Sequence, residues 1–131
     1  MDAINVLNCA AALMDLRGHS NDGPGHLWGD KSLCALEAIA LADGRARDDW
    51  HTASRHASPA VQALAEVIAE PPPDYFDYAD ADSHSINCVI VYCFNDRPEC
   101  TKAHMTAMLR TAAAMLKARA PSVIQREAVC A

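Results

Sequence analysis

Apolar side chains return every three or four positions along most of the chain, the spacing that places them on one face of an α-helix. In residues 2–17, Ile4, Leu7 and Met14 follow this spacing. Three further stretches with the same pattern occupy residues 33–43, 59–70 and 97–119. We therefore expect four helices over these ranges.

Residues suited to helix ends bound these stretches. A polar side chain that can accept from the free amides of a first turn precedes each one, namely Asp2, Ser32, Ser58 and Asp96. Pro59 fits the first position of its helix. Gly18, Gly44 and the triple proline at 71–73 fit the ends of the first three. The polar segment 45–57 is expected to hold only a short helix around Trp50.

Residues 83–94 are ambiguous from their composition. Ile86, Val89, Ile90 and Val91 favour a strand. No second stretch with strand character is visible to pair with it, so we interpret this segment as a fifth, buried helix. The expected fold class is all-α, a compact bundle of about five helices with an extended acidic connection.

Length and composition agree with that fold. The 131 residues suit one domain, 1–131, whose tail from about residue 121 is expected to be weakly ordered. The chain has 26 alanines but only two Trp, three Tyr and two Phe. Alanine has the highest helix propensity, and its small side chain allows close packing between helices.

Charge is unevenly distributed. The net charge is −6 and the pI about 5.3, which argues against nucleic-acid binding, because such binding depends on Lys and Arg neutralising phosphates. No Lys or Arg occurs from His56 to Asp96, whereas six follow from Arg97 onward. Either the acidic middle faces the protein's own basic C-terminal helix, or it forms a docking face for a basic protein partner.

The acidic connection is the surface we expect to bind such a partner. Aromatic side chains supply contact area, and aspartates attract a basic surface. The residues concerned are Asp74, Tyr75, Phe76, Asp77, Tyr78, Asp80 and Asp82. The alternative is a solvated connection whose aromatic side chains pack against the bundle.

A set of cysteines and histidines offers a second hypothesis, a zinc site. Two Cys/His pairs are each four residues apart, so each would share one helix face. The set comprises His84, Cys88, Cys93, Cys100 and His104. Zinc needs four such ligands, but no Cys-x-x-Cys pair is present. Packing of the cysteines in the core, with the histidines in solvent, is the competing interpretation, and we expect no cofactor.

An enzyme is the third hypothesis. Cys34 lies early in an apolar helix, where the thiol pKa can fall, and Glu37 is a carboxylate within the same apolar stretch. The alternatives are a core cysteine, and a glutamate that reaches the rim or pairs with an arginine. No Gly-x-Ser-x-Gly, phosphate-loop or His-Glu-x-x-His motif occurs. We therefore expect a non-catalytic protein.

The six cysteines do not indicate a disulfide framework. The start of the chain lacks the basic region of a signal peptide, and no apolar stretch approaches the roughly 18 residues of a membrane span. We therefore expect free thiols in the cytoplasm and no membrane association.

Two short motifs resemble those of a known family. The segment Cys34-Ala-Leu-Glu-Ala-Ile-Ala-Leu-Ala42 resembles a Cys-x-x-Gly-Ala-Ile-x-x-Ala stretch, and Phe94-Asn95-Asp96 resembles a Trp-Asn-Asp turn before an alanine-rich helix. Both occur, in this order, in a small uncharacterised domain family of actinobacteria and their phages. Glu37 stands where that family has glycine, and Phe94 where it has tryptophan.

The resemblance covers roughly residues 10–116 and implies a small helical domain in a bacterial or phage setting. A phage-encoded accessory protein that binds a host factor is one role it implies. Read physically, Asn95 and Asp96 are expected to bond the free amides that begin the last helix. Cys34 and Ile39 are expected to be packing positions.

Overall fold

A computed structural model describes residues 2–21, 31–77 and 79–119, and in these ranges the protein is an all-α bundle. The elements are α1 (Ala3–Arg17), α2 (Ala35–Ala42), the 3-10 helix η2 (Arg47–His51), α3 (Ala57–Ile68), α4 (Ser83–Asn95) and α5 (Lys102–Arg119). The expected fold class is confirmed. The tail predicted from about residue 121 lies outside the described residues.

The ambiguous segment 83–94 is a helix, α4, as we expected. In the described ranges the only bridge between extended segments is a single parallel one, from His19 to Leu33. Within the same ranges, none of the helices combines the length and the apolar content needed to cross a membrane.

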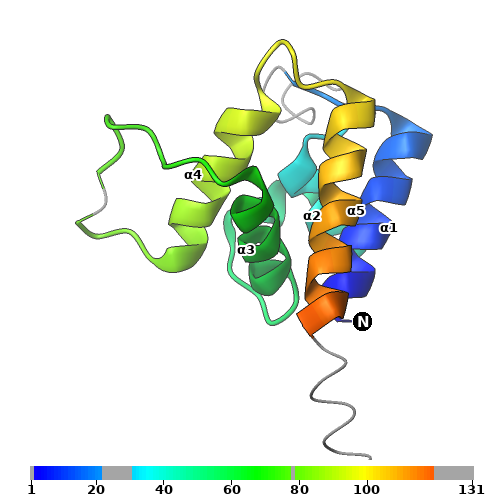
Figure 1. The fold of residues 1–131 in the computed structure, drawn as a ribbon, viewed down its shortest axis with the longest axis horizontal. Coiled ribbons are helices and arrows are strands. Elements are labelled where there is room, and N and C mark those ends of the chain that lie inside the picture. The colour runs from blue at the N-terminus through cyan, green and yellow to red at the C-terminus, as the bar shows by residue number, and fades with distance from the viewer. Residues whose placement is uncertain (1, 22–30, 78, 120–131) are drawn as a thin grey trace, which may run out of the picture.

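The most extensive contact between two helices is that of the first and the last helix, α1 and α5. Helices α1 and α5 lie side by side and run in opposite directions, with α2 against α1 and α3 between α4 and α5 (Figure 1). Ala10 and Ala11 of α1 and Ala112 and Ala113 of α5 are all buried. Because the distance between packed helices depends on the side chains at their contact, these alanines allow a close approach.

The expected cap of the first helix is confirmed, and the expected cap of the third helix, Ser58, is wrong. The Asp2 carboxylate accepts from the Asn5 amide at 2.9 Å and caps α1. Helix α3 begins at Ala57, two residues before the expected position. The hydroxyl oxygen of Ser54 accepts from the Ala57 amide at 2.9 Å, so Ser54 takes the role that we expected of Ser58.

The expected caps of the second and last helices are wrong. Helix α2 begins at Ala35 rather than Leu33, because the Leu33 amide donates to Gly18 and its carbonyl accepts from Ser20. Its N-cap is therefore Cys34. The last helix begins at Lys102, five residues later than Asp96 would allow.

The start of α5 is set by Thr101, whose hydroxyl oxygen accepts from the His104 amide at 3.2 Å. Asp96 instead ends α4, where its amide donates to the Tyr92 carbonyl oxygen at 2.9 Å. A turn of residues 97–101 thus separates the two helices. A sequence pattern that continues through such a turn does not show where the helix begins.

Two residues with positive φ are expected to respond oppositely to substitution. Gly18 follows α1 at φ 97° and ψ 167°, a conformation nearly confined to glycine. We expect Gly18→Ala to lower the free energy of unfolding by about 1–3 kcal/mol. Ala69 ends α3 in the left-handed region, at φ 57° and ψ 34°. There Ala69→Gly is expected to raise the free energy of unfolding by up to about 1 kcal/mol.

Urea unfolding followed by circular dichroism measures both changes. A Gly18→Ala protein as stable as the wild type would contradict the backbone strain expected at that residue.

Candidate functional site

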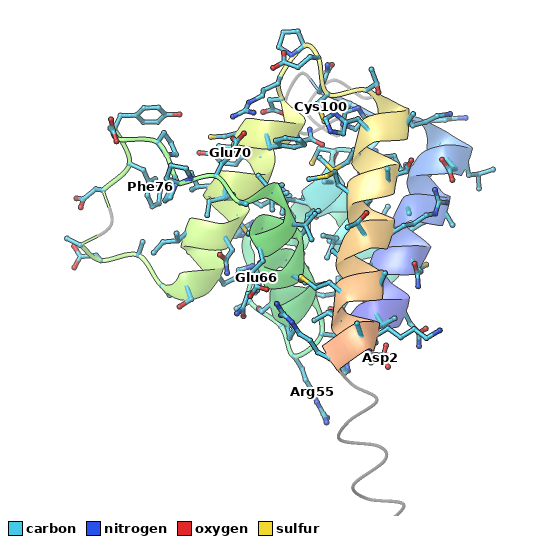
Figure 2. All side chains as sticks on the ribbon, viewed as in Figure 1. Asp2, Arg55, Glu66, Glu70, Phe76 and Cys100 are labelled. Carbon is cyan, nitrogen blue, oxygen red and sulfur yellow. The ribbon has the colours of Figure 1, made fainter. Side chains whose placement is uncertain are left out.

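The connection between α3 and α4 projects away from the bundle (Figure 1). Tyr75 lies on it with 81% of its surface exposed. The alternative in which the aromatic side chains pack against the bundle fits Tyr75 poorly, although its hydroxyl oxygen lies 4.0 Å from the Cys93 sulfur of α4. It holds better for Phe76, which is half-buried and lies beside α4 (Figure 2). Tyr78 lies outside the described residues.

The carboxylates of this connection have two kinds of role. Asp74, Asp77 and Asp80 are exposed, and within the described ranges none of them forms an ion pair. The Asp77 carboxylate accepts from the Ala79 amide at 3.0 Å. Asp82 caps α4, since its carboxylate accepts from the Ser85 amide at 2.7 Å, and this bond lowers the pKa of Asp82. Asp82 therefore has a structural role besides its charge.

Two other acids of the acidic middle pair with arginines, one in the turn before α5 and one at the end of α5. The Arg97 guanidinium donates to both carboxylate oxygens of Glu70, and this pairing lowers the pKa of Glu70. The Arg119 guanidinium donates to Glu66 at 2.9 Å. The glutamates of α3 and of the residues just after it therefore form ion pairs within the molecule. The aspartates of the connection are instead exposed to solvent.

The cysteines and histidines of the zinc hypothesis do not lie together at one site. Among the described residues, no three His, Cys, Asp or Glu side chains lie close enough to hold a metal ion. Only His84 and Cys88 meet, with the histidine Nε2 and the cysteine Sγ 3.4 Å apart. His104 is exposed and packs edge-on against the Phe94 ring.

The remaining members of that set have other surroundings. Cys100 is buried in the core. Cys93 is half-buried, with its Sγ 4.0 Å from the Tyr75 hydroxyl oxygen. The Nδ1 atom of His84 is buried and has no hydrogen-bond partner within the described ranges. The arrangement supplies a two-residue contact rather than a tetrahedral ligand set.

Cys34 and Glu37, the residues of the enzyme hypothesis, form a capping box. The Glu37 carboxylate accepts from the Cys34 amide at 3.1 Å, and the Glu37 amide donates to the Cys34 sulfur at 3.4 Å. Glu37 is fully buried and accepts from Arg47 Nε at 2.8 Å, so the alternative of pairing with an arginine is confirmed. Arg47 also donates to the Ser32 carbonyl oxygen at 2.7 Å.

This environment does not activate a thiol. Burial raises the pKa of Cys34 to about 12, and the Cys88 pKa rises to about 12 for the same reason. Since the thiolate is the nucleophile, both residues are unreactive near neutral pH. Cys34 lies in the core, as the sequence indicated.

Asn95 joins three parts of the chain. Its side-chain oxygen accepts from the Ala35 amide at 3.0 Å and from His19 Nε2 at 2.9 Å. Its side-chain nitrogen donates to the Ser20 carbonyl oxygen at 2.8 Å and to Asp96 at 3.0 Å. Asn95 is 1% exposed, so nearly its whole hydrogen-bonding capacity is used inside the protein.

The expectation that Asn95 bonds the start of the last helix is therefore wrong. It bonds the first amide of α2, which is 60 residues earlier in the chain. The two motifs of the family resemblance, one beginning at Cys34 and one containing Asn95, are thus in direct contact. The sequence indicated that Asn95 can bond a free amide at the start of a helix. It did not indicate that this helix is α2.

Fold and site together define a small helical-bundle domain in which a buried polar network around Asn95 joins the end of α4 to the start of α2 and to the segment after α1. A family model described as a family of unknown function, DUF6197, matches residues 1–115, and the chain belongs to that family. No curated protein and no solved structure matches the chain.

Proposed function

We propose that this protein is a non-catalytic interaction domain that binds a basic protein partner through the acidic loop, defined here as residues 74–82. The observation that carries the proposal is Tyr75, a large aromatic side chain that is 81% exposed among the exposed aspartates of a projecting connection. Tyrosine is enriched at interface cores, where it supplies rigid contact area.

The charge of the loop supports a basic partner. Asp74, Asp77 and Asp80 lie exposed in a stretch of sequence without Lys or Arg. Like charges in one place create a field that speeds encounter with a surface of opposite sign. The buried, protonated thiols of Cys34 and Cys88 support a role without covalent catalysis.

We further propose a cytoplasmic setting and an accessory role, in an actinobacterium or one of its phages, in which the partner is a host factor. Free thiols support the cytoplasmic setting. Within the described ranges Cys9, Cys34, Cys88, Cys93 and Cys100 form no disulfide. Free cysteines in such number are typical of reducing compartments. The two motifs shared with the actinobacterial and phage family support the accessory role.

Selection of binders from a random peptide display library tests the proposal. We expect the selected peptides to be enriched in Arg and Lys. We expect them to lose about tenfold or more in affinity for a loop variant carrying Tyr75→Ala, Asp74→Asn and Asp77→Asn. The asparagine at position 77 keeps an oxygen that can accept from the Ala79 amide, so the variant removes charge without removing this turn contact.

A second charge-neutralised protein serves as the matched control. Asp48, Asp49 and Glu99 are exposed acids outside the acidic loop. The variant Asp48→Asn with Glu99→Gln removes the same number of charges as the loop variant. It is expected to bind the selected peptides as the wild type does. Peptides without basic enrichment, or equal losses in both variants, would refute the acidic loop as the binding surface.

A further inference from the structure

A hollow of about 250 Å³ lies between η2, the acidic loop and α4. Among the described residues, four ring-bearing side chains line it, and we call it the aromatic hollow: Trp50, His51, Phe76 and Tyr92. Pockets for whole small-molecule ligands are typically about 300–1,000 Å³. The aromatic hollow is smaller and suits the head group of one side chain.

The Trp50 ring meets two other rings of the aromatic hollow nearly at right angles. The planes of Trp50 and Tyr92 meet at 90° with centroids 6.4 Å apart, and those of Trp50 and His51 meet at 85° with centroids 5.7 Å apart. The face of an aromatic ring carries negative electrostatic potential, which attracts a cation within about 6 Å of the ring centre.

The described α4 residues that line the hollow carry no positive charge. Ser85, Cys88 and Val89 lie on α4 with Tyr92, and burial raises the pKa of Cys88 to about 12, so its thiol is neutral. No Lys or Arg is among the described residues that line the aromatic hollow. Arg45 contacts η2 but donates to the carbonyl oxygens of Asp49 and Thr52.

Three aspartates are next to lining residues in the sequence or bonded to one of them. Asp77 follows Phe76 in the chain, and Asp49 precedes Trp50. The Asp82 carboxylate accepts from the amide of Ser85, another lining residue, at 2.7 Å. The Asp82 charge also acts on the Cys88 thiol, so this carboxylate is close enough to favour a positively charged occupant of the hollow.

We propose that the aromatic hollow binds the guanidinium group of an arginine side chain of the basic partner. This inference rests on the proposed function and names the residue type that anchors the partner. Guanidinium is planar and weakly hydrated, so it stacks on aromatic faces more readily than an ammonium group does. Phe76 connects the two sites, because it belongs to the acidic loop and also lines the hollow.

Two short peptides test the proposal on the full chain: acetyl-Gly-Arg-Gly-amide and its citrulline counterpart, which has the same shape without the charge. The readout is the indole N–H signal of Trp50 in a nitrogen-15 NMR spectrum, assigned with Trp50→Phe. We expect the arginine peptide to shift this signal in a saturable way and to bind about 5–10-fold more tightly than the citrulline peptide.

A variant of the hollow and a distant control test the inference. Phe76→Leu keeps an apolar lining but removes a ring, and is expected to weaken binding of the arginine peptide about threefold or more. Leu16→Ala changes an exposed side chain of α1 outside both the hollow and the acidic loop, and is expected to leave arginine-peptide binding unchanged. Equal binding of the two peptides, no shift at Trp50, or no effect of Phe76→Leu would overturn the inference. None of these outcomes depends on whether the display peptides contact Tyr75.

Discussion

Replacing Asn95 with alanine is expected to lower the free energy of unfolding by about 3–5 kcal/mol, because it leaves several buried polar groups without partners. The Ala35 amide and the Ser20 carbonyl oxygen both bond the Asn95 side chain, and both residues are buried. Each such group costs about 1–3 kcal/mol when unsatisfied. Urea unfolding followed by circular dichroism measures the loss, with an expected fall in midpoint and an unchanged slope.

A second asparagine of the same helix provides the control. Asn87 is half-buried on α4, and no hydrogen bond of its side chain occurs in the described ranges. Asn87→Ala gives the same gain in helix propensity as Asn95→Ala, so the difference between the two variants isolates the network. Asn87→Ala is expected to change the free energy of unfolding by no more than about 0.5 kcal/mol. Equal stability of the two variants would show that the network around Asn95 contributes little.

The variant Arg47→Met is expected to lower the free energy of unfolding by about 3–5 kcal/mol. Glu37 is fully buried, and Arg47 supplies the charge that compensates its carboxylate at 2.8 Å. Removing one partner of a buried ion pair leaves an uncompensated charge in a region of low polarity, which costs far more than the pair itself contributes. The loss of the bond from Arg47 to the Ser32 carbonyl oxygen acts in the same direction.

An exposed ion pair shows what burial contributes. Arg110 and Asp15 join α5 to α1 at 2.6 Å, with side chains 50% and 45% exposed. Exposed pairs contribute about 0–1 kcal/mol, so Arg110→Met is expected to have a small effect. Thermal unfolding of both variants at low and at high salt is the measurement. A loss for Arg47→Met no larger than that for Arg110→Met would contradict a structural role for the buried pair.

The helices could be predicted from the sequence because their apolar spacing is local information. The spacing placed α1 correctly, and the absence of a second strand-like stretch led to a helix at 83–94. The starts of α2 and α5 could not be placed in this way. Leu33 has the composition of a helical residue, yet its backbone bonds Gly18 and Ser20. That competition depends on a contact between segments that the local pattern does not contain.

Some features of the candidate site could likewise be predicted from the sequence, and others could not. An acidic segment with aromatic residues is visible in the sequence, and so is the absence of nearby cations. The exposure of Tyr75 and the pairing of Glu66 and Glu70 with arginines depend on tertiary structure. Trp50 could be placed in a short helix, but nothing in the sequence brings its ring against that of Tyr92, 42 residues later.

Titration calorimetry of one selected basic peptide tests the central claim, binding through the acidic loop, most directly. The titration compares the wild type with the loop variant (Tyr75→Ala, Asp74→Asn, Asp77→Asn) and with the control variant (Asp48→Asn, Glu99→Gln). We predict a dissociation constant about tenfold or more higher for the loop variant only, and weaker binding to the wild type as salt rises from about 0.05 to 0.3 M. A loop variant that binds as tightly as the wild type, or binding independent of salt, would contradict the proposed function.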